Sequence, residues 1–267
     1  MKTRDLTVLE QIIVRKRAEL VAQQTLVKPE TLEARKRPAR RPFRSALKAK
    51  TPAIISEIKK ASPSAGVITE QFEPAVIAAR YESAGAAALS ILTDQQFFQG
   101  SLKDLAAARN ATNLPVLRKD FTLDRYHLLE AAAWGADAVL LIVAALSDQK
   151  LRELIAQSEE LNLEVLVEVH NEAELERALS AEANWIGINN RNLKTLEVSL
   201  ETSLLLAELI PSDVFWISES GIRSPKEIRQ LVDAGCDGFL VGESLMKKDD
   251  PGQALSELIQ GARIGGS

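Results

Sequence analysis

Lysine and carboxylate side chains recur in this sequence in an arrangement suited to proton transfer. Glu57 and Lys59 are two residues apart, and Lys119, Glu168 and Asn189 each stand at the end of a short apolar run. A lysine can donate a proton to a carbonyl oxygen, whereas a carboxylate can remove a proton from carbon or nitrogen. These residue types indicate general acid–base chemistry, and on residue types alone an aldolase that forms a Schiff base stays open.

Metal and nucleotide chemistry is disfavoured by the same sequence. The chain has one cysteine and two histidines, too few for a zinc site built from soft ligands. Glu57, Glu168 and Glu219 are interleaved with lysines, which would repel a divalent cation. Neither a G-x-G-x-x-G pattern nor a Walker A pattern occurs. We therefore expect no metal site and no dinucleotide or P-loop chemistry.

The elements that must position these residues are short apolar runs separated by longer amphipathic stretches. The runs begin roughly 21 to 34 residues apart, which is the length of one strand and one helix. Near-continuous apolar strands that alternate with helices are typical of a parallel sheet with covered faces. The sequence thus predicts an α/β protein, a closed (β/α)8 TIM barrel. The predicted strands are 53–58, 87–92, 115–118, 138–143, 164–169, 185–188, 214–218 and 238–241.

An internal repeat fixes the phase of these strands. Gly85, Gly135 and Gly235 each follow a predicted helix and precede a strand, at separations of 50 and 100 residues, and Glu182 holds the same place in a degenerate copy. A glycine there can end the helix in the left-handed conformation, and the small residues around it allow a tight turn. The period of two strand–helix units indicates four quarter-barrels.

In such a barrel the active site lies at the carboxyl ends of the strands. Side chains alternate along a strand, so Glu57 and Lys59 face the same way, and Lys119, Glu168 and Asn189 can all point into one mouth. So many charges at one rim would be costly to bury unless they pair with each other or bind a ligand. His170 shares the face of Glu168, and both a polar rim role and a catalytic role are open for it.

Glycines after the last two strands predict a phosphate site. Barrels of this kind often bind phosphate with the loops after strands seven and eight. Ser220 and Gly221 follow the seventh predicted strand, and Gly242 and Glu243 follow the eighth. Glycine lets backbone N–H groups approach a phosphate closely, and the Ser220 hydroxyl can donate a hydrogen bond. For Glu243 we assign only the backbone N–H.

The amino-terminal part of the chain predicts a helical extension outside the barrel. Thr7 and Glu10 form a capping-box pair, and a helical stripe continues through Leu9, Ile12, Ile13, Lys16 and Leu20. We place the extension at residues 1–50 and the barrel at 51–267, as one domain overall. The extension is expected to pack on the barrel and to cover the mouth.

Charge is unevenly distributed along the chain. The formal net charge is −4, yet residues 28–50 hold nine basic residues against two acidic ones. This segment can be read as a nucleic-acid arm, as a solvated linker or as a rim that attracts an anionic small molecule. The segment has one aromatic residue, Phe43, whereas nucleic-acid arms often interleave several. We therefore expect no nucleic-acid partner.

Composition bounds the class of protein. The chain has 267 residues, of which 46% are hydrophobic and 26% charged, as in ordinary globular proteins and unlike disordered or collagen-like chains. Its longest apolar stretch, 138–146, is too short to span a bilayer, and no apolar signal segment opens the chain. A single cysteine, Cys236, cannot form an internal disulfide, which favours a reducing cytoplasm.

Eight motifs together resemble indole-3-glycerol phosphate synthase, the ring-closing enzyme family of tryptophan biosynthesis. The first motif, Glu-Ile-Lys-Lys-Ala-Ser-Pro-Ser at 57–64, looks like the signature of that family. The resemblance extends over essentially the whole chain. The other motifs lie at 89–94, 98–101, 118–121, 167–169, 187–193, 217–222 and 241–246.

The resemblance implies a carbon–carbon lyase that closes a ring with loss of carbon dioxide and water and uses no cofactor. It implies 1-(2-carboxyphenylamino)-1-deoxyribulose 5-phosphate as the substrate, with Lys119 as general acid and Glu168 as general base. Lys59 would pair with anionic groups of the substrate. Glu57 and Asn189 would orient the lysines. Arg191, Glu219 and Ser62 would bind the substrate. Phe98, Phe121 and Leu140 would form an apolar wall.

Two other functions are open at this stage. A phosphosugar isomerase of the same pathway would need an acid and a base but no pocket for decarboxylation, and the motif at 57–64 argues against it. A non-catalytic phosphate-binding or nucleic-acid-binding protein would not need Lys59, Lys119 and Glu168 together. We expect a small phosphorylated substrate, no membrane contact, and a monomer or a weak homo-oligomer.

Overall fold

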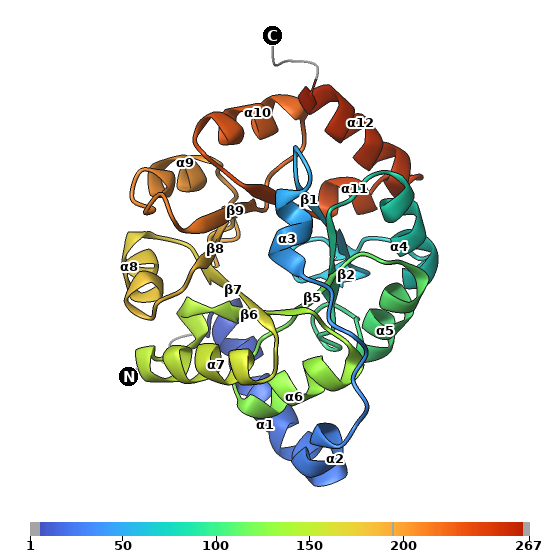
Figure 1. Ribbon diagram of the computed structural model, residues 1–267, viewed down its shortest axis with the longest axis vertical. Helices are drawn as coiled ribbons and strands as arrows, with labels where there is room; N and C mark the ends of the chain where they lie inside the picture. Colours follow the sequence, from blue (N-terminus) through green and yellow to red (C-terminus); the bar gives the residue numbers. More distant parts are fainter. Residues whose placement is uncertain (1–5, 194, 264–267) are drawn as a thin grey trace.

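Parallel strands pair side by side and close into a barrel in the computed structural model, which describes residues 6–193 and 195–263 (Figure 1). Around the barrel the strand order is β1-β10-β9-β8-β7-β6-β5-β4, and β4 pairs with β1 to close it. The barrel strands are β1 (Ile54–Ile58), β4 (Ala88–Leu92), β5 (Val116–Lys119), β6 (Ala138–Ile142), β7 (Glu164–Val169), β8 (Trp185–Asn189), β9 (Phe215–Glu219) and β10 (Gly238–Val241). A two-stranded hairpin of β2 (Ala61–Ser62) and β3 (Gly66–Val67) follows β1.

Helices cover the outside of the barrel, and further helices lie before β1, after β6 and after β10 (Figure 1). The outer helices are α4 (Pro74–Ser83), α5 (Leu102–Ala111), α6 (Arg125–Trp134), α7 (Asp148–Glu160), α8 (Glu172–Ser180), α9 (Glu201–Ala207), α10 (Pro225–Asp233) and α12 (Pro251–Arg263). The remaining ones are α1 (Val8–Leu26), α2 (Pro29–Glu33), α3 (Phe43–Lys48), η1 (Val143–Ala145) and α11 (Glu243–Met246). The prediction of a (β/α)8 barrel with an amino-terminal helix is confirmed.

The strand boundaries differ from the predicted runs by one residue at several ends. Pro115 lies outside β5, because proline has no N–H for the strand ladder. Lys119, Asn189 and Glu219 are the last residues of β5, β8 and β9, although they are polar. Since their side chains alternate into the barrel, the strands carry them directly into its mouth.

The repeat before the strands forms the turns that the glycines predict. Gly85, Gly135 and Gly235 have φ values of 97°, 91° and 88°, and Glu182 has a φ of 59°. All four residues therefore adopt the left-handed conformation that ends a helix, and Glu182 does so without the freedom of glycine.

Apolar side chains fill the barrel on both sides of its strands. Inside the barrel, Leu117, Leu140, Leu166 and Ile217 belong to one buried cluster. A larger cluster lies between the strands and the outer helices. Leu117, Leu166 and Ile217 precede Lys119, Glu168 and Glu219 by two positions, so β5, β7 and β9 each present first an apolar and then a charged side chain to the interior.

Helix α3 closes the amino end of the barrel, and Figure 1 shows it across the barrel centre. Phe43 and Leu47 are fully buried, and the Phe43 ring centroid lies 5.2 Å from that of Trp185, the first residue of β8. This part of the extension is thus built into the core of the barrel at the end opposite to the mouth.

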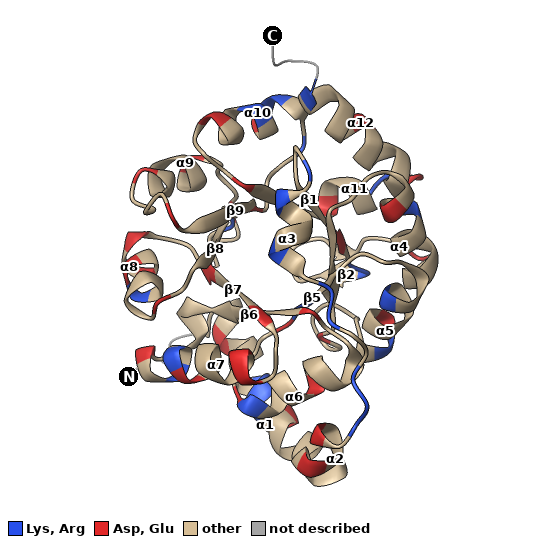
Figure 2. Cartoon of the chain, in the orientation of Figure 1, with Lys and Arg blue, Asp and Glu red and all other residues tan. Residues whose placement is uncertain are grey.

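The basic segment before and within α3 binds acidic residues at the same end, and Figure 2 shows its basic residues between α2 and α3. Arg40 lies 2.6 Å and Arg44 3.0 Å from oxygens of Glu164, which opens β7. The Arg41 backbone N–H donates to Asp137, directly before β6. These arginines therefore bind the barrel at the end opposite to the mouth, so they do not form an anion-attracting rim around the mouth.

Helix α1 lies at the other end of the barrel. The predicted capping box is present, since the Glu10 N–H donates to the Thr7 hydroxyl and Glu10 accepts from the Thr7 N–H. Ile12 and Lys16 are the buried residues of its inner face. In the described part of the chain, no helix is long and apolar enough to cross a membrane. The outermost parts of the predicted extension and barrel, residues 1–5 and 264–267, lie outside the described residues.

Candidate active site

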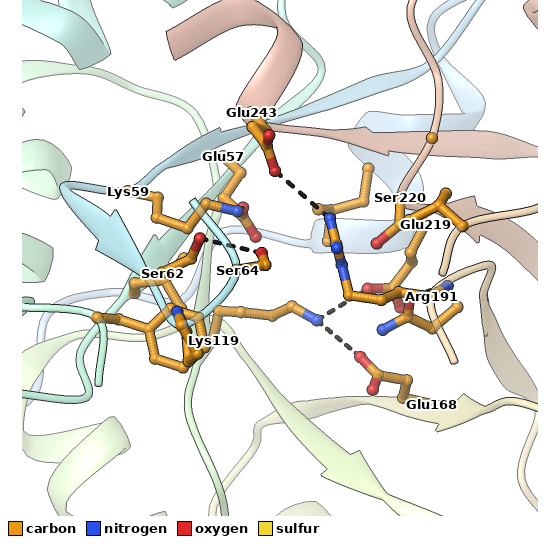
Figure 3. A pocket seen from close by; sticks show the side chains of 18 of the residues that line it. Glu57, Lys59, Ser62, Ser64, Lys119, Glu168, Arg191, Glu219, Ser220 and Glu243 are labelled. Atoms are coloured by element: carbon orange, nitrogen blue, oxygen red, sulfur yellow. Dashed lines mark hydrogen bonds and ion pairs between the residues drawn. The ribbon is translucent and has the colours of Figure 1, made fainter. Parts of the chain in front are cut away.

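A cavity of about 610 Å³ opens at the carboxyl ends of the strands (Figure 3). Its walls come from all parts of the chain, from α1 to α11. Every residue that the sequence proposes for the site lines this cavity: Glu57, Lys59, Ser62, Phe98, Lys119, Phe121, Leu140, Glu168, Asn189, Arg191, Glu219, Ser220, Gly221, Gly242 and Glu243. Strand alternation places those that belong to barrel strands, the loops after the strands carry the others, and the individual roles stay predictions.

Lys119 is the centre of the charged cluster. Its Nζ lies 2.7 Å from Oε2 of Glu168 and 2.8 Å from Oε2 of Glu219 (Figure 3). Burial alone would lower the pKa of Lys119, but the two carboxylates outweigh it and hold the pKa well above its usual range. Lys119 is therefore an ammonium group at neutral pH, as a proton donor must be.

Lys119 and Glu168 are in direct contact. Lys119 ends β5 and Glu168 belongs to β7, so β6 separates their strands. Lysine and glutamate side chains are nevertheless long enough to meet inside a narrow barrel, and opposite charges attract strongly in a medium of low dielectric constant. The acid and the base of the predicted reaction thus share a hydrogen bond.

The two carboxylates beside Lys119 have opposite pKa shifts. Burial raises the pKa of Glu168, but Lys119 and His170 outweigh it and hold the pKa well below its usual range. For Glu219, burial and the charge of Glu168 prevail over Lys119 and raise the pKa to about 7. Glu168 is the ionised partner and Glu219 the one closer to protonation.

Glu57 and Lys59 form the second charged pair of the mouth. The Lys59 ammonium donates to Oε1 of Glu57 at 2.6 Å, as expected for side chains two residues apart on one strand face. On the opposite side, the Asn189 side-chain oxygen accepts from the Arg191 backbone N–H at 3.0 Å. These contacts fix the direction of the side chains that surround the cavity.

The turn after β9 and the start of α11 form the predicted phosphate end. Ser220 and Gly221 have φ values of 66° and 84°, so the backbone turns sharply there. Gly242 directly precedes α11, and a Cβ atom on it would lie 2.9 Å from Cβ of Glu57. A side chain at Gly242 would therefore enter the space of a cavity residue.

The carboxylate of Glu243 is paired within this end of the cavity. Its oxygens lie 3.4 Å from Arg191 and 2.7 Å from Lys247 (Figure 3 shows the Arg191 pair). The hydrogen bond from Lys247 is the main cause that lowers the pKa of Glu243. Ser244, Lys247 and Lys248 also line this end, and the sequence analysis missed them. They could have been found from the sequence, because they follow the Gly242 turn.

Aromatic and aliphatic side chains form the other side of the cavity. The ring centroids of Phe98 and Phe121 lie 6.3 Å apart, and Leu140 lines the same cavity. Val8, Leu9 and Ile12 of α1 complete the lining. Sequence reasoning found the apolar stripe of this helix and its expected place at the mouth, but it assigned none of these residues to the site, because a stripe does not specify what covers it.

Ser62 stabilises the loop that follows β1. Its hydroxyl accepts from the Ala65 N–H at 3.1 Å and lies 3.3 Å from the Ser64 hydroxyl. Ser64 lines the cavity as well and was not predicted. Among the described residues, no group of three histidine, cysteine, aspartate or glutamate side chains is arranged to hold a metal ion.

Two charged residues behind the cavity wall were not assigned roles from the sequence. Lys16 is only 6% exposed and makes ion pairs with Asp94 at 2.9 Å and Asp120 at 2.8 Å. His170 lies between Glu168 and Glu174. In the sequence, Lys16 could have been found as a lysine inside an apolar helical stripe. His170 could have been found because it shares a strand face with Glu168.

Comparison with known proteins gives one family. The family model described as indole-3-glycerol phosphate synthase matches residues 9–258. A protein of that name from Polaromonas sp. is 50% identical over 258 residues, which cover 94% of this chain and 97% of that protein. One from Acidithiobacillus ferrooxidans is 51% identical over 258 residues, with coverage of 94% and 98%.

Solved structures of low sequence identity share the fold. A thiamine phosphate pyrophosphorylase from Pyrococcus furiosus superposes with a TM-score of 0.61 at 17% identity, over 83% of this chain and 100% of that one. A structure described as native KDPGal superposes with a TM-score of 0.55 at 16% identity, over 80% and 94%. At such identities the likeness concerns the barrel alone.

Proposed function

The chain belongs to the indole-3-glycerol phosphate synthase family, and we propose that it converts 1-(2-carboxyphenylamino)-1-deoxyribulose 5-phosphate into indole-3-glycerol phosphate. The observation that carries this proposal is the position of Lys119. Its ammonium group contacts Glu168 and Glu219 in a cavity that is also lined by the aromatic side chains of Phe98 and Phe121 and by the turns at Gly221 and Gly242. The residues that we propose as acid, base, aryl pocket and phosphate end all line this cavity.

The two ends of the cavity suit the two ends of this substrate. The aryl ring would pack against Phe98, Phe121 and Leu140, where apolar contact is available. The phosphate would accept hydrogen bonds from Ser220 and from the backbone N–H groups of Gly221, Gly242 and Glu243. Lys59 and Arg191 also line the cavity, and their positive charges would attract the anionic groups of the substrate.

Ring closure needs a proton at the ketone oxygen. The ring carbon that bears the carboxylate attacks the ketone carbon, and Lys119 donates a proton to the oxygen as the new carbon–carbon bond forms. The cationic adduct then loses carbon dioxide, because the electron pair of the broken bond returns to the ring. That step needs no base. Glu57 and Asn189 would keep the lysines and the new hydroxyl in place.

Dehydration needs a second proton at the same oxygen and a base at the neighbouring carbon. The hydroxyl leaves as water after a lysine protonates it, and Glu168 removes a proton from the carbon beside the nitrogen. Two protons enter the oxygen and one leaves the carbon, so one net proton is taken up for the carboxylate lost as carbon dioxide. Because Lys119 and Glu168 share a hydrogen bond, Glu168 can return its proton to Lys119.

Side-chain groups of the protein suffice for this chemistry, so the proposed enzyme is a carboxy-lyase that uses no metal or organic cofactor. We propose that it works in the cytoplasm as a monomer or weak homo-oligomer, without a nucleic-acid partner. The barrel and its extension are proposed to fold as one domain.

The test is a fluorescence assay for the indole product with purified protein, the proposed substrate and EDTA. We expect product from the wild-type protein and at least a hundredfold slower turnover in Lys119→Met. Folded wild-type protein that forms no product would overturn the proposal, and product formation that stops in EDTA would overturn its cofactor independence.

A further inference from the structure

His170 lies outside the cavity, directly behind Glu168. It follows β7, the strand that carries Glu168, and its side chain is only 8% exposed. It is absent from the cavity lining, so it does not face a bound substrate. Whatever it contributes to the reaction must therefore pass through Glu168.

The imidazole ring lies between two carboxylates. Its Nε2 is 3.3 Å from Oε1 of Glu168, and its Nδ1 is 2.9 Å from Oε2 of Glu174 in α8. The contact with Glu168 is an ion pair that is not aligned as a hydrogen bond, since Nε2 has no hydrogen-bond partner among the described residues. The contact with Glu174 is a hydrogen bond.

Glu174 is itself held in place. One of its oxygens accepts from the His170 backbone N–H at 2.9 Å, and the other accepts from the Asn171 side-chain amide at 2.9 Å. The Glu174 N–H in turn donates to the Asn171 side-chain oxygen, which caps α8. The first turn of α8 thus fixes the carboxylate that orients His170.

The groups that face this pair come from several elements. Lys119 of β5 contacts the second oxygen of Glu168, and Glu219 of β9 lies on the far side of Lys119. Burial lowers the pKa of His170, but Glu168 and Glu174 outweigh it and raise the pKa to about 9. An imidazole held between two carboxylates is therefore cationic at neutral pH.

We propose that His170 is a positioning residue for the reaction: paired with Glu174, its imidazolium holds Oε1 of Glu168, so that Oε2 stays directed at Lys119 and the reacting carbon. This role rests on the proposed function of Glu168 as the base. It resembles the way in which outer carboxylates orient ligating histidines in other sites. His170 also keeps Glu168 ionised, because a cation beside a carboxylate disfavours its protonation.

The proposal predicts a kinetic effect that a loss of packing alone would not give. In His170→Gln, a neutral amide replaces the cation, so Glu168 becomes easier to protonate. We expect kcat to fall roughly tenfold, far less than the 10²–10⁴-fold loss of an acid or base itself. The acid limb of the kcat profile should move about one pH unit upward, and KM should stay within about twofold, since His170 does not line the cavity.

Glu174→Gln provides the second variant and Glu176→Gln the matched control. Glu174→Gln weakens the charge on His170 and should shift the same limb in the same direction by a smaller amount. Glu176 lies two residues further along α8 and is exposed, so its variant should keep the wild-type profile. If His170→Gln does not fold, Glu174→Gln still decides, because an unchanged profile in that variant overturns the proposal.

Nuclear magnetic resonance tests the charge of His170 without reference to activity. The chain has two histidines, and burial, with the charge of Arg118, lowers the pKa of His127 to about 3. With labelled histidine, one ring should stay neutral and the other charged from pH 5 to 8, and Glu174→Gln should lower the pKa of the charged one. A His170 ring that is neutral at pH 7 in the wild-type protein would overturn the proposal.

The outcomes separate this inference from the proposed function. Folded wild-type protein without synthase activity would overturn the function and this role of His170 together. An active wild-type protein whose pH profile is unchanged in His170→Gln would overturn the positioning role alone. An upward shift of the acid limb in both variants, with a charged His170 ring, would establish it.

Discussion

Nζ of Lys16 in α1 lies 2.8 Å from Oδ1 of Asp120, the residue that follows Lys119 at the end of β5. The same Nζ lies 2.9 Å from Asp94, whose other oxygen accepts from the backbone N–H groups of Phe97 and Phe98. A single buried lysine therefore joins the amino-terminal helix to two walls of the cavity, the strand of the proposed acid and the loop of the aromatic side chains.

Lys16→Met should destabilise the protein and impair its use of substrate. Removal of one partner from a buried ion pair costs about 3–5 kcal/mol, since Asp94 and Asp120 would stay buried without their cation. Because the freed carboxylates hold the walls near Phe98 and Phe121, we expect KM to rise several-fold. Urea denaturation and steady-state kinetics measure the two effects. Arg17→Met, one residue away on an exposed position, is the control, and equal behaviour of both variants would contradict the role of Lys16.

Strand ends were the part of the site that sequence could predict. A strand of a closed barrel directs every second side chain inward, so Glu57, Lys119, Glu168 and Glu219 had to meet once the strands were located. The repeat marked every second strand, because a left-handed residue precedes β4, β6, β8 and β10, and the apolar runs between them gave the other four. Even Glu182, which is not glycine, adopts this conformation at its place in the repeat.

Ion pairs between residues that are far apart in the sequence could not be predicted. Arg40 and Glu164 are 124 residues apart, and no local pattern connects a basic segment with one carboxylate at the start of β7. The same holds for Lys16, whose place in an apolar stripe shows burial but not its partners. For Lys119, side-chain length decided the direct contact with Glu168, which strand order alone does not give.

Lys119→Met should abolish most of the activity while the barrel stays folded. Methionine keeps the length of the side chain but removes the proton donor, so kcat should fall by about 10²–10⁴-fold. It also leaves Glu168 and Glu219 without their shared cation, and some loss of stability will accompany it. The indole assay and circular dichroism measure both. Lys103→Met, on the exposed face of α5, should behave as wild type, and wild-type kcat in Lys119→Met would refute the proposed acid.

Glu219→Gln should change how stability depends on pH. Burial and the charge of Glu168 raise the pKa of Glu219 to about 7, whereas an unfolded chain has a glutamate pKa of about 4.3. Between these values the folded state binds more protons than the unfolded state, so Glu219 makes the free energy of unfolding fall as pH rises. Glutamine does not titrate, so Glu219→Gln lacks this decrease. The free energy of unfolding of the variant should therefore rise relative to that of the wild type from pH 5 to 7, by at most about 1.4 kcal/mol per pH unit.

Urea denaturation at several pH values tests this prediction. Glu208→Gln, at an exposed position after α9, should leave the dependence unchanged. A stability difference between Glu219→Gln and wild type that stays constant from pH 5 to 7 would mean that Glu219 has an ordinary pKa.

Gly242→Ala should impair both binding and turnover. A side chain here would block the approach of the backbone to the predicted phosphate, which raises KM. The structure adds a second effect, because the new Cβ would meet Glu57, the partner of Lys59. We therefore expect KM to rise about tenfold or more and kcat to fall as well.

Gly235→Ala is the control: its Cβ meets nothing within 4 Å, and its positive φ should reduce stability without changing either kinetic constant. An unchanged kcat in Gly242→Ala would argue against the contact with Glu57.

Phe43→Ala should reduce stability and leave the kinetics intact. The sequence alone predicts that residues 1–50 form an extension that covers the mouth. Phe43, however, is fully buried against Trp185 at the amino end of the barrel, remote from the strand ends that carry the site. Replacement of a buried phenylalanine by alanine costs about 3–5 kcal/mol, which lowers Tm by roughly 10 °C in a protein of this size. Leu26→Ala, at a side chain that is 82% exposed, should change neither quantity. Thermal unfolding and KM at 25 °C show whether Phe43 lies at the amino end of the barrel or at its mouth. A raised KM at an unchanged Tm in Phe43→Ala would place this segment at the mouth.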